Sequence, residues 1–221
     1  LLADPRVTAL GVHIEGIGDI RALEALAVTA HKLGKPIVAL KAGKSHQART
    51  ATISHTASLA GSAAGSSALL SRLRIAQVDS LSGLLETLKL LHVTGPLASN
   101  RIASMSCSGG EASLMADCAV GHALIFPDLE DVQKIALRNA LGPKVALANP
   151  LDYHTYIWRN QAAMTQAWAA MADDDIAMTL LISDYPRADL GDASDWECVT
   201  QAAIEATRRT GRPYAVVASL A

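Results

Sequence analysis

Short, continuously apolar runs alternate along this chain with longer segments whose apolar residues recur at helical spacing. Residues 7–14 and 36–40 have the pattern of buried strands, and a helical pattern that follows Asp19 separates them. Asp19 suits an N-cap, and Gly34 followed by Pro36 is a usual helix end. Because strand–helix–strand units need crossover connections, the alternation predicts an α/β fold with mostly parallel sheets.

The same alternation continues to the end of the chain. The predicted strands are 75–78, 102–105, 123–125, 176–183 and 214–219. Helices are predicted at 58–73, 128–141 and 195–210. Another is predicted to be capped by Asp79 or Ser80 and to run to about 92, and one more is predicted to begin at about 111. Met164, Met171 and Met178 are predicted to fill the core or its rim.

A segment rich in Gly, Pro and small polar residues, 94–100, interrupts this pattern. The strand–helix alternation restarts after it. We therefore predict two doubly wound α/β domains, residues 1–95 and 100–221. In such sheets ligands bind at the carboxyl ends of the strands, where the polar segments described below fall.

Composition narrows the class of protein. Half of the 221 residues are hydrophobic and 18% are charged, which suits a packed core, and the net charge of −2 gives no electrostatic reason to expect nucleic acid. No apolar run reaches the ~20 residues of a membrane-spanning helix. The three cysteines fit neither a disulfide framework nor a zinc site, which favours a reducing cytoplasm.

The chain begins at Leu1, without Met, and ends just after an apolar run. From this pattern we expect it to be part of a longer polypeptide.

The long polar segment 41–61 follows a predicted buried strand and contains His46 and His55. Long loops in compact domains are often functional, and the helix predicted after it offers free amides to an anion. A neutral imidazole there is a suitable nucleophile toward phosphorus. A surface loop with solvated histidines remains the alternative. The segment is not a phosphate-binding P-loop, because Val38 stands where that motif needs Gly.

Glu15 directly follows the first predicted strand, beside Gly16 and Gly18. A carboxylate at the carboxyl end of a strand is placed to hydrogen-bond a histidine and fix its tautomer. A solvated acid in a turn is the alternative. The glycines are not a dinucleotide fingerprint, because Arg21 occupies the third glycine position.

Residues 106–113, with Gly109 and Gly110, have the pattern of a strand, a tight turn and a helix. Glycines at a helix N-terminus expose amides that bind anions. The segment also resembles a nucleophile elbow around Ser108, but Ser106 stands where that motif needs Gly. A structural turn is the alternative.

The fourth polar segment, Asn149-Pro150-Leu151-Asp152, indicates a turn. Asp152 is suited to cap a helix, to bind a metal through water or to orient a substrate. A purely structural turn is again the alternative.

Together these segments resemble the NDP-forming acyl-CoA synthetases, which include ADP-forming acetyl-CoA synthetase and belong to the succinyl-CoA synthetase superfamily. The most specific similarity lies in residues 35–43 and 54–61. The resemblance implies that His55 is transiently phosphorylated, although Ala57 stands where the family often has Gly. Glu15 matches the acid that supports the phosphohistidine.

The resemblance also implies two consecutive flavodoxin-like domains, the first bearing the phosphohistidine. Residues 102–111 are similar to a second cradle for the phosphohistidine, and 149–152 to a recurrent turn of the family. The implied phosphate-binding residues are Ser54, Thr56, Ala57, Ser108, Gly109 and Gly110, while Asn149 and Asp152 are candidates for substrate contact. No metal ligand is expected in this chain.

Members of this family interconvert a carboxylic acid, CoA and ATP with acyl-CoA, ADP and phosphate. The resemblance implies CoA, ATP or GTP, and Mg²⁺ for the complete enzyme, but no cofactor held by these residues alone. It also implies a CoA-binding domain and an ATP-grasp domain in the same polypeptide or on a partner subunit, in a homo- or hetero-oligomer. This chain alone is therefore expected to be inactive.

Two other functions remain open from the sequence. One is a serine hydrolase that uses Ser108, and the other is a non-catalytic, ligand-binding or regulatory relative with the same fold. The acid is also open. The polar and aromatic run 153–158 differs from the aliphatic context associated with acetate-specific members, which leaves a bulkier or polar acid among the alternatives without selecting one.

Overall fold

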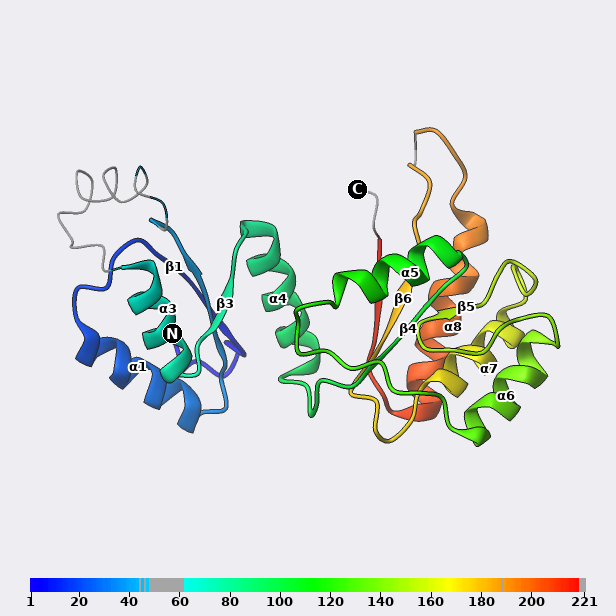
Figure 1. Ribbon diagram of the computed structural model, residues 1–221, viewed down its shortest axis with the longest axis horizontal. Coiled ribbons are helices and arrows are strands. Elements are labelled where there is room, and N and C mark those ends of the chain that lie inside the picture. The colour runs from blue at the N-terminus through cyan, green and yellow to red at the C-terminus, as the bar shows by residue number, and fades with distance from the viewer. Residues whose placement is uncertain (44, 46, 48–61, 188, 219–221) are drawn as a thin grey trace. The chain divides into compact units, whose positions relative to one another are not determined.

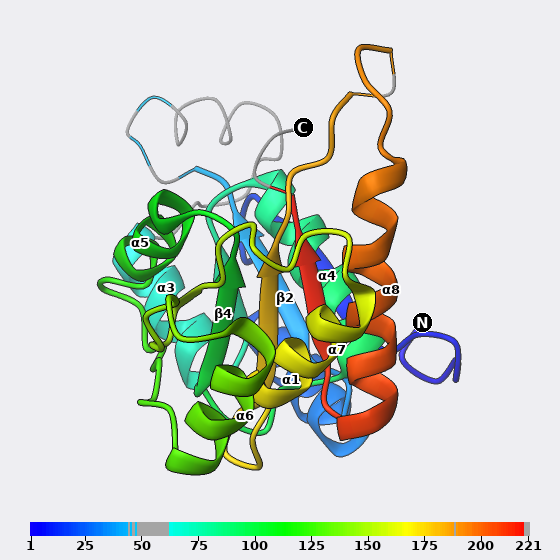
Figure 2. The ribbon, with the colours of Figure 1, turned by 90° about the vertical axis from the view of Figure 1, so that its right-hand side faces the viewer.

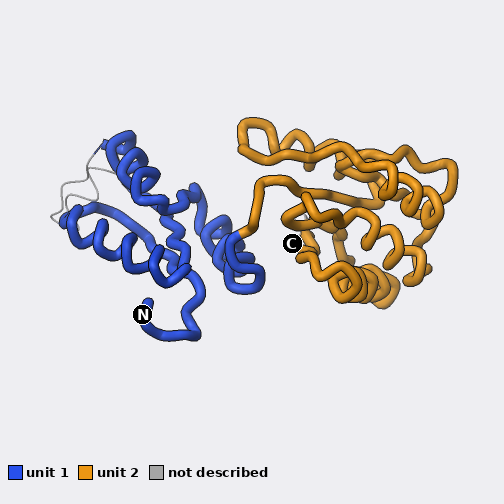
Figure 3. The backbone as a smooth tube through the Cα atoms, turned by 90° about the horizontal axis from the view of Figure 1, so that it is seen from below, with its two compact units in different colours: residues 1–96 blue, residues 97–221 orange. Residues whose placement is uncertain are grey.

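The computed structural model describes residues 1–43, 45, 47, 62–187 and 189–218. The chain divides into two compact units, Leu1–Pro96 and Leu97–Ala221, coloured separately in Figure 3. The division falls within the predicted linker, residues 94–100. His55, with Ser54, Thr56 and Ala57, lies outside the described residues. Within the described residues, no helix combines the length and the apolar character needed to cross a membrane.

The first unit is built on a parallel sheet in the order β1-β2-β3. Each strand pairs with the one before it, so both crossovers run in the same direction and place their helices on the same face. The described elements are β1 (Leu10–Ile14), α1 (Ile20–Lys32), β2 (Ile37–Lys41), α3 (Ala63–Arg72), β3 (Ala76–Val78) and α4 (Leu81–Thr94), as Figure 1 shows.

The core of the first unit lies between the sheet and the helices α1 and α3. Its fully buried members include Ala30, Ala39 and Leu70. On the opposite face α4 approaches the sheet so closely that a Cβ at Gly11 would lie 2.5 Å from Leu88 Cδ1. Only glycine fits there without displacing the Leu88 side chain, so helices cover both faces of this sheet.

The second unit is a parallel sheet in the order β5-β4-β6-β7. Its elements are β4 (Ile102–Ser106), α5 (Gly109–Cys118), α6 (Asp131–Leu141), β5 (Leu151–Asp152), α7 (Gln161–Met171), β6 (Met178–Ile182), α8 (Ser194–Thr210) and β7 (Tyr214–Val217). The chain first moves from β4 outward to β5 and then crosses back to β6, so the direction of winding reverses at β4.

This reversal places helices on both faces of the second sheet. Figure 2 shows α6, α7 and α8 lying over one face, where they enclose a core around Met105, Trp168 and Leu181. On the other face Leu114 and Met115 of α5 border a hollow together with Ile182. The predicted core methionines are confirmed, since Met164, Met171 and Met178 are all buried.

One predicted strand is wrong, because residues 123–125 form only an isolated bridge between Ile125 and Arg101. The outer partner of β4 consists instead of Ile125, the Asn149 side chain and the two-residue strand β5. Ile125 bonds to the start of β4, and β5 pairs with its end. Between them the Asn149 side chain accepts a hydrogen bond from Ser104 N at 3.1 Å and donates one to Ile102 O at 3.0 Å.

Candidate functional site

The predicted anion-binding turn lies at the carboxyl end of β4, where Ser108 takes the N-cap position of α5 and Gly109 begins the helix. The Ser106 hydroxyl donates a hydrogen bond to Ser108 O at 2.8 Å, which fixes the turn from inside. The Ser108 side chain makes no capping bond. The Ser108 side chain therefore leaves the first amides of α5 without a cap. An anion-binding helix N-terminus requires such uncapped amides.

Asp152 lies beside this turn because β5 pairs with the end of β4, in the register Ser106–Asp152. A Cβ added at Gly109 would lie 3.2 Å from Asp152 Oδ2. Asp152 Oδ1 accepts a hydrogen bond from His154 N at 2.9 Å, and the His154 ring lies 3.7 Å from Oδ2. Gly109 and Asp152, two residues singled out from distant segments, thus lie together.

Asn149, the other candidate residue of the segment 149–152, has a structural role. Besides its two bonds to β4, its side chain donates a hydrogen bond to Pro127 O at 3.1 Å. The peptide bond between Asn149 and Pro150 is cis. The Asn149 amide group is thus occupied by backbone partners.

Glu111, in the first turn of α5, was not singled out from the sequence. Partial burial and the nearby carboxylates of Asp184 and Asp152 raise its pKa above the usual value. Its Oε2 atom is buried and has no hydrogen-bond partner among the described residues. Burial and the charge of Glu111 likewise raise the pKa of the neighbouring Cys107 thiol. In the described part of the chain, no group of three or more His, Cys, Asp or Glu side chains is arranged to hold a metal ion.

These residues border a cavity of about 360 Å³ at the carboxyl ends of β4 and β6. Cys107 and Glu111 line it from the end of β4, and Ser183 and Asp184 from the end of β6. Thr155, Trp158 and Trp196 complete the lining. This is the place where the direction of winding reverses, and ligands of open α/β sheets bind at such points.

The two tryptophans of this cavity pack edge to face, with ring centroids 5.5 Å apart and an interplanar angle of 78°. Trp158 belongs to the turn after β5, and Trp196 to the start of α8. Arg159 follows Trp158 in the sequence and Asp195 precedes Trp196. An ion pair between Arg159 and Asp195 joins the same two segments. The ring contact and the ion pair therefore hold Trp158 and Trp196 together as one aromatic wall of the cavity.

Among the described residues, the candidate of the first unit is Glu15, which directly follows β1 and is partly buried. Lys41, the last residue of β2, is only 6% exposed. Its ammonium group donates hydrogen bonds to Glu15 O at 2.7 Å and to Ala42 O. This buried cation was not predicted as a site residue, because the sequence placed Lys41 at the start of a polar loop.

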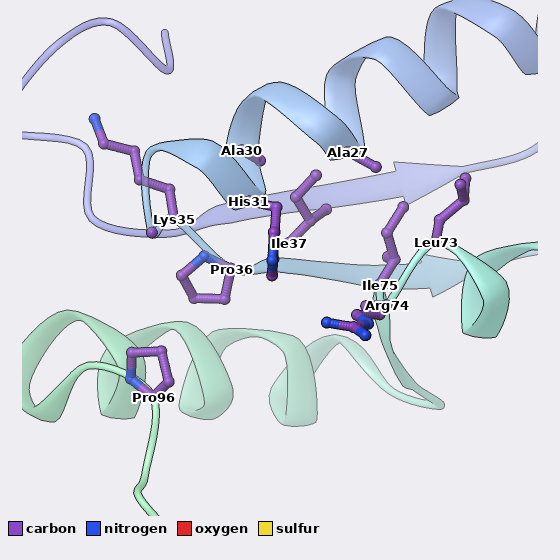
Figure 4. Close-up of a pocket in the computed structure, with 11 residues that line it drawn as sticks. Ala27, Ala30, His31, Lys35, Pro36, Ile37, Leu73, Arg74, Ile75 and Pro96 are labelled. Atoms are coloured by element: carbon purple, nitrogen blue, oxygen red, sulfur yellow. The ribbon is translucent and has the colours of Figure 1, made fainter.

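Another cavity of the first unit, of about 330 Å³, lies at the amino end of β2 and is drawn in Figure 4. His31 and Arg74 border it among mostly apolar residues, beside the C-terminal ends of α1 and α3. Helix C-termini carry partial negative charge, and ligands of parallel sheets bind at the other end. We therefore place the candidate site of this unit at Glu15 and Lys41.

The hydrolase hypothesis requires a histidine hydrogen-bonded to Ser108. In the part of the chain that the structure describes, no such bond to Ser108 is present, and the His154 ring stacks on Tyr156 with centroids 5.3 Å apart. The arrangement around Ser108 thus fits an anion-binding turn better than a nucleophile with its base.

Residues 1–91 match the family model of the succinyl-CoA ligase like flavodoxin domain. The alpha subunit of ADP-forming acetate–CoA ligase II of Pyrococcus furiosus is 36% identical over 145 residues, which are 65% of this chain and 31% of that subunit. A trans-feruloyl-CoA synthase of an unknown prokaryotic organism is 28% identical over 175 residues, 79% of this chain and 25% of that protein. The chain thus spans about a third or less of the length of these relatives.

A solved structure, the dinucleotide forming acetyl-coenzyme A synthetase 1 of Ca. Korarchaeum cryptofilum in complex with phosphate and ADP, superposes with a TM-score of 0.80. The alignment covers 98% of this chain and 46% of that one, at 19% identity. At this identity the similarity concerns the fold, and it extends over both units.

Proposed function

This chain belongs to the NDP-forming acyl-CoA synthetase family, and from that membership we propose that it is part of an enzyme that joins a carboxylic acid to CoA. The complete enzyme interconverts acid, CoA and ATP with acyl-CoA, ADP and phosphate. The single observation that carries the proposal is the family match over residues 1–91, which contain both His55 and Glu15.

We assign the phosphoryl carrier to His55. In the synthetic direction an imidazole nitrogen attacks the γ-phosphorus of ATP and ADP leaves. A carboxylate oxygen of the acid then takes the phosphoryl group from the histidine, which gives an acyl phosphate. The CoA thiolate attacks the acyl carbon, and phosphate leaves. The three steps sum to the proposed reaction, with His55 regenerated.

Glu15 and Lys41 support this assignment through their place at the carboxyl edge of the first unit. A carboxylate there is suited to orient an imidazole, as the family resemblance implies for Glu15. The buried Lys41 ammonium holds the backbone of Glu15 and adds positive charge at the edge where a phosphoryl group would be handled.

The turn at α5 supports the second role, that of holding the phosphoryl anion. Its first amides are not capped by Ser108, and Gly109 and Gly110 leave room for close approach of an anion. Ser54, Thr56 and Ala57 complete the proposed phosphate contacts, together with Ser108. CoA, the nucleotide and Mg²⁺ are bound elsewhere in the complete enzyme or by a partner subunit.

The test is detection of phosphohistidine in the full polypeptide that carries this chain, incubated with Mg²⁺ and γ-labelled ATP. We expect alkali-stable, acid-labile label in the wild type and in His31→Ala, which removes an exposed histidine of α1, but none in His55→Ala. Unchanged labelling of His55→Ala would contradict the assignment. Absence of label in every variant, with ATP binding verified, would favour a non-catalytic relative.

A further inference from the structure

The cavity beside the α5 turn is larger than a two-carbon acid requires. Its volume of about 360 Å³ lies within the range of pockets that enclose ring-sized ligands. It is formed within the second unit, next to the turn to which we assign the phosphoryl anion. A substrate bound there has its reacting end close to that turn.

Two of the walls are aromatic. Trp158 and Trp196 meet edge to face at 5.5 Å, and both line the cavity. Flat rings gain additional attraction from such walls through stacked or tilted contacts, whereas a methyl group gains only burial. The walls therefore favour a planar, ring-bearing ligand.

Two of the polar residues that line the cavity are carboxylates, Glu111 and Asp184. Glu111 Oε2 is buried without a partner among the described residues, and Asp184 is close enough to act on the pKa of Glu111. A carboxylate that entered the cavity would be repelled by both groups. A neutral ring that carries a hydroxyl group would supply the missing donor, since an unpaired buried acceptor is unfavourable.

We propose that this cavity selects the acid substrate, and that the acid carries a planar ring with a hydroxyl group, the ring lying against the wall formed by Trp158 and Trp196. The identification of the bound acid as a substrate rests on the proposed function. The carboxylate remains outside the cavity, at the N-terminus of α5, where the helix amides favour an anion. The ring hydroxyl donates its hydrogen bond to Glu111.

The inference is tested by calorimetric titration of the full polypeptide that carries this chain with para-hydroxycinnamic acid, cinnamic acid and acetate. We expect para-hydroxycinnamic acid to bind most tightly, cinnamic acid to bind more weakly, and acetate not to compete. Trp158→Ala and Trp196→Ala should each weaken binding about tenfold. Tyr156→Ala is the matched control, because it removes an exposed neighbouring ring that does not line the cavity.

Further variants separate ring contact from loss of folding. Trp196→Phe keeps a ring and should retain most of the affinity, whereas Trp196→Leu keeps bulk alone and should bind as weakly as Trp196→Ala. Circular dichroism and thermal unfolding verify that each variant is folded. Equal affinity of wild type and both Trp→Ala variants, equally effective competition by acetate, or no binding of either ring acid would overturn the proposal.

Failure of this inference is distinguishable from failure of the proposed function. Label on His55 in the full polypeptide, with no binding of the ring acids, would overturn the cavity proposal alone. Binding of the ring acids as expected, with no label on His55, would leave the cavity as a ligand site and overturn the phosphoryl-transfer proposal.

Discussion

The ammonium group of Lys41 donates a hydrogen bond to the backbone carbonyl oxygen of Glu15 at 2.7 Å. The contact joins the ends of β1 and β2, whose last residues pair in the register Ile14–Lys41. The position of Glu15 is thus fixed through its backbone, which leaves its carboxylate available for another partner.

The first prediction concerns this contact. Lys41→Met should lower the free energy of unfolding by about 1–3 kcal/mol, because buried carbonyl groups lose a donor. In the full polypeptide it should also slow phosphorylation of His55, as measured with γ-labelled ATP.

Lys35→Met is the matched control for Lys41→Met. The Lys35 ammonium also donates to two backbone carbonyl groups, those of Leu2 and Asp4, but at the amino end of the sheet. Its replacement should cost stability without slowing phosphorylation. An equal loss of phosphorylation in both variants would show that the effect comes from stability and not from the edge that holds Glu15.

The second prediction compares the two glycines at the start of α5. Gly110→Ala should raise the midpoint of thermal unfolding, because alanine favours a helix by up to about 1 kcal/mol and its Cβ meets nothing closer than Ser108 Oγ at 3.5 Å. Gly109→Ala should lose this gain, since its Cβ would lie 3.2 Å from Asp152 Oδ2. Equal midpoints for the two variants would contradict the close packing of Gly109 and Asp152.

The third prediction concerns Asn149, whose side chain bonds to the backbone of Ile102, Ser104 and Pro127. Asn149→Ala should destabilise the chain by about 2 kcal/mol or more in urea unfolding, since it leaves several backbone groups unpaired. Asn139→Ala, on the exposed side of α6, should change stability by less than about 0.5 kcal/mol. Similar values for both variants would refute the role of Asn149 in the sheet.

The fourth prediction is a loss of stability in alkali. Burial raises the pKa of Tyr214 to about 12, and its hydroxyl donates to Trp168 O at 2.7 Å. Because the folded pKa exceeds the unfolded value of about 10, this contribution is complete below pH 10 and is lost as the pH rises toward 12. Tyr214→Phe should be less stable at pH 7 and show a weaker pH dependence between those values. An unchanged pH dependence would contradict the burial of this hydroxyl.

Local signals in the sequence predicted most of the helices and strands. Asp19 caps α1 as expected, and Ser80, one of the two candidates with Asp79, caps α4, because a short polar side chain before an apolar periodic run has few other roles. The buried strands were recognisable as continuous apolar runs. These features depend on neighbours in the sequence, and therefore they are visible without the fold.

Long-range features were not predictable in the same way. Residues 123–125 are apolar, but the Asn149 side chain and β5 occupy the rest of the edge beside β4, so only Ile125 pairs. The wall formed by Trp158 and Trp196 brings together residues 38 positions apart. Its existence depends on where α8 begins relative to the turn after β5, which local patterns do not specify.

The segmented partner of β4 has a consequence for how this domain tolerates change. Ile125 is anchored to the amide of Ile102, the Asn149 side chain to Ile102 O and Ser104 N, and β5 to the end of β4 at Ser106. The connection between Ile125 and α6 is itself held at Pro127, whose carbonyl oxygen accepts a hydrogen bond from Asn149. A change in the length of that connection therefore has to leave Pro127 beside Asn149, or the residue that precedes the turn of Asp152 loses one of its three anchors.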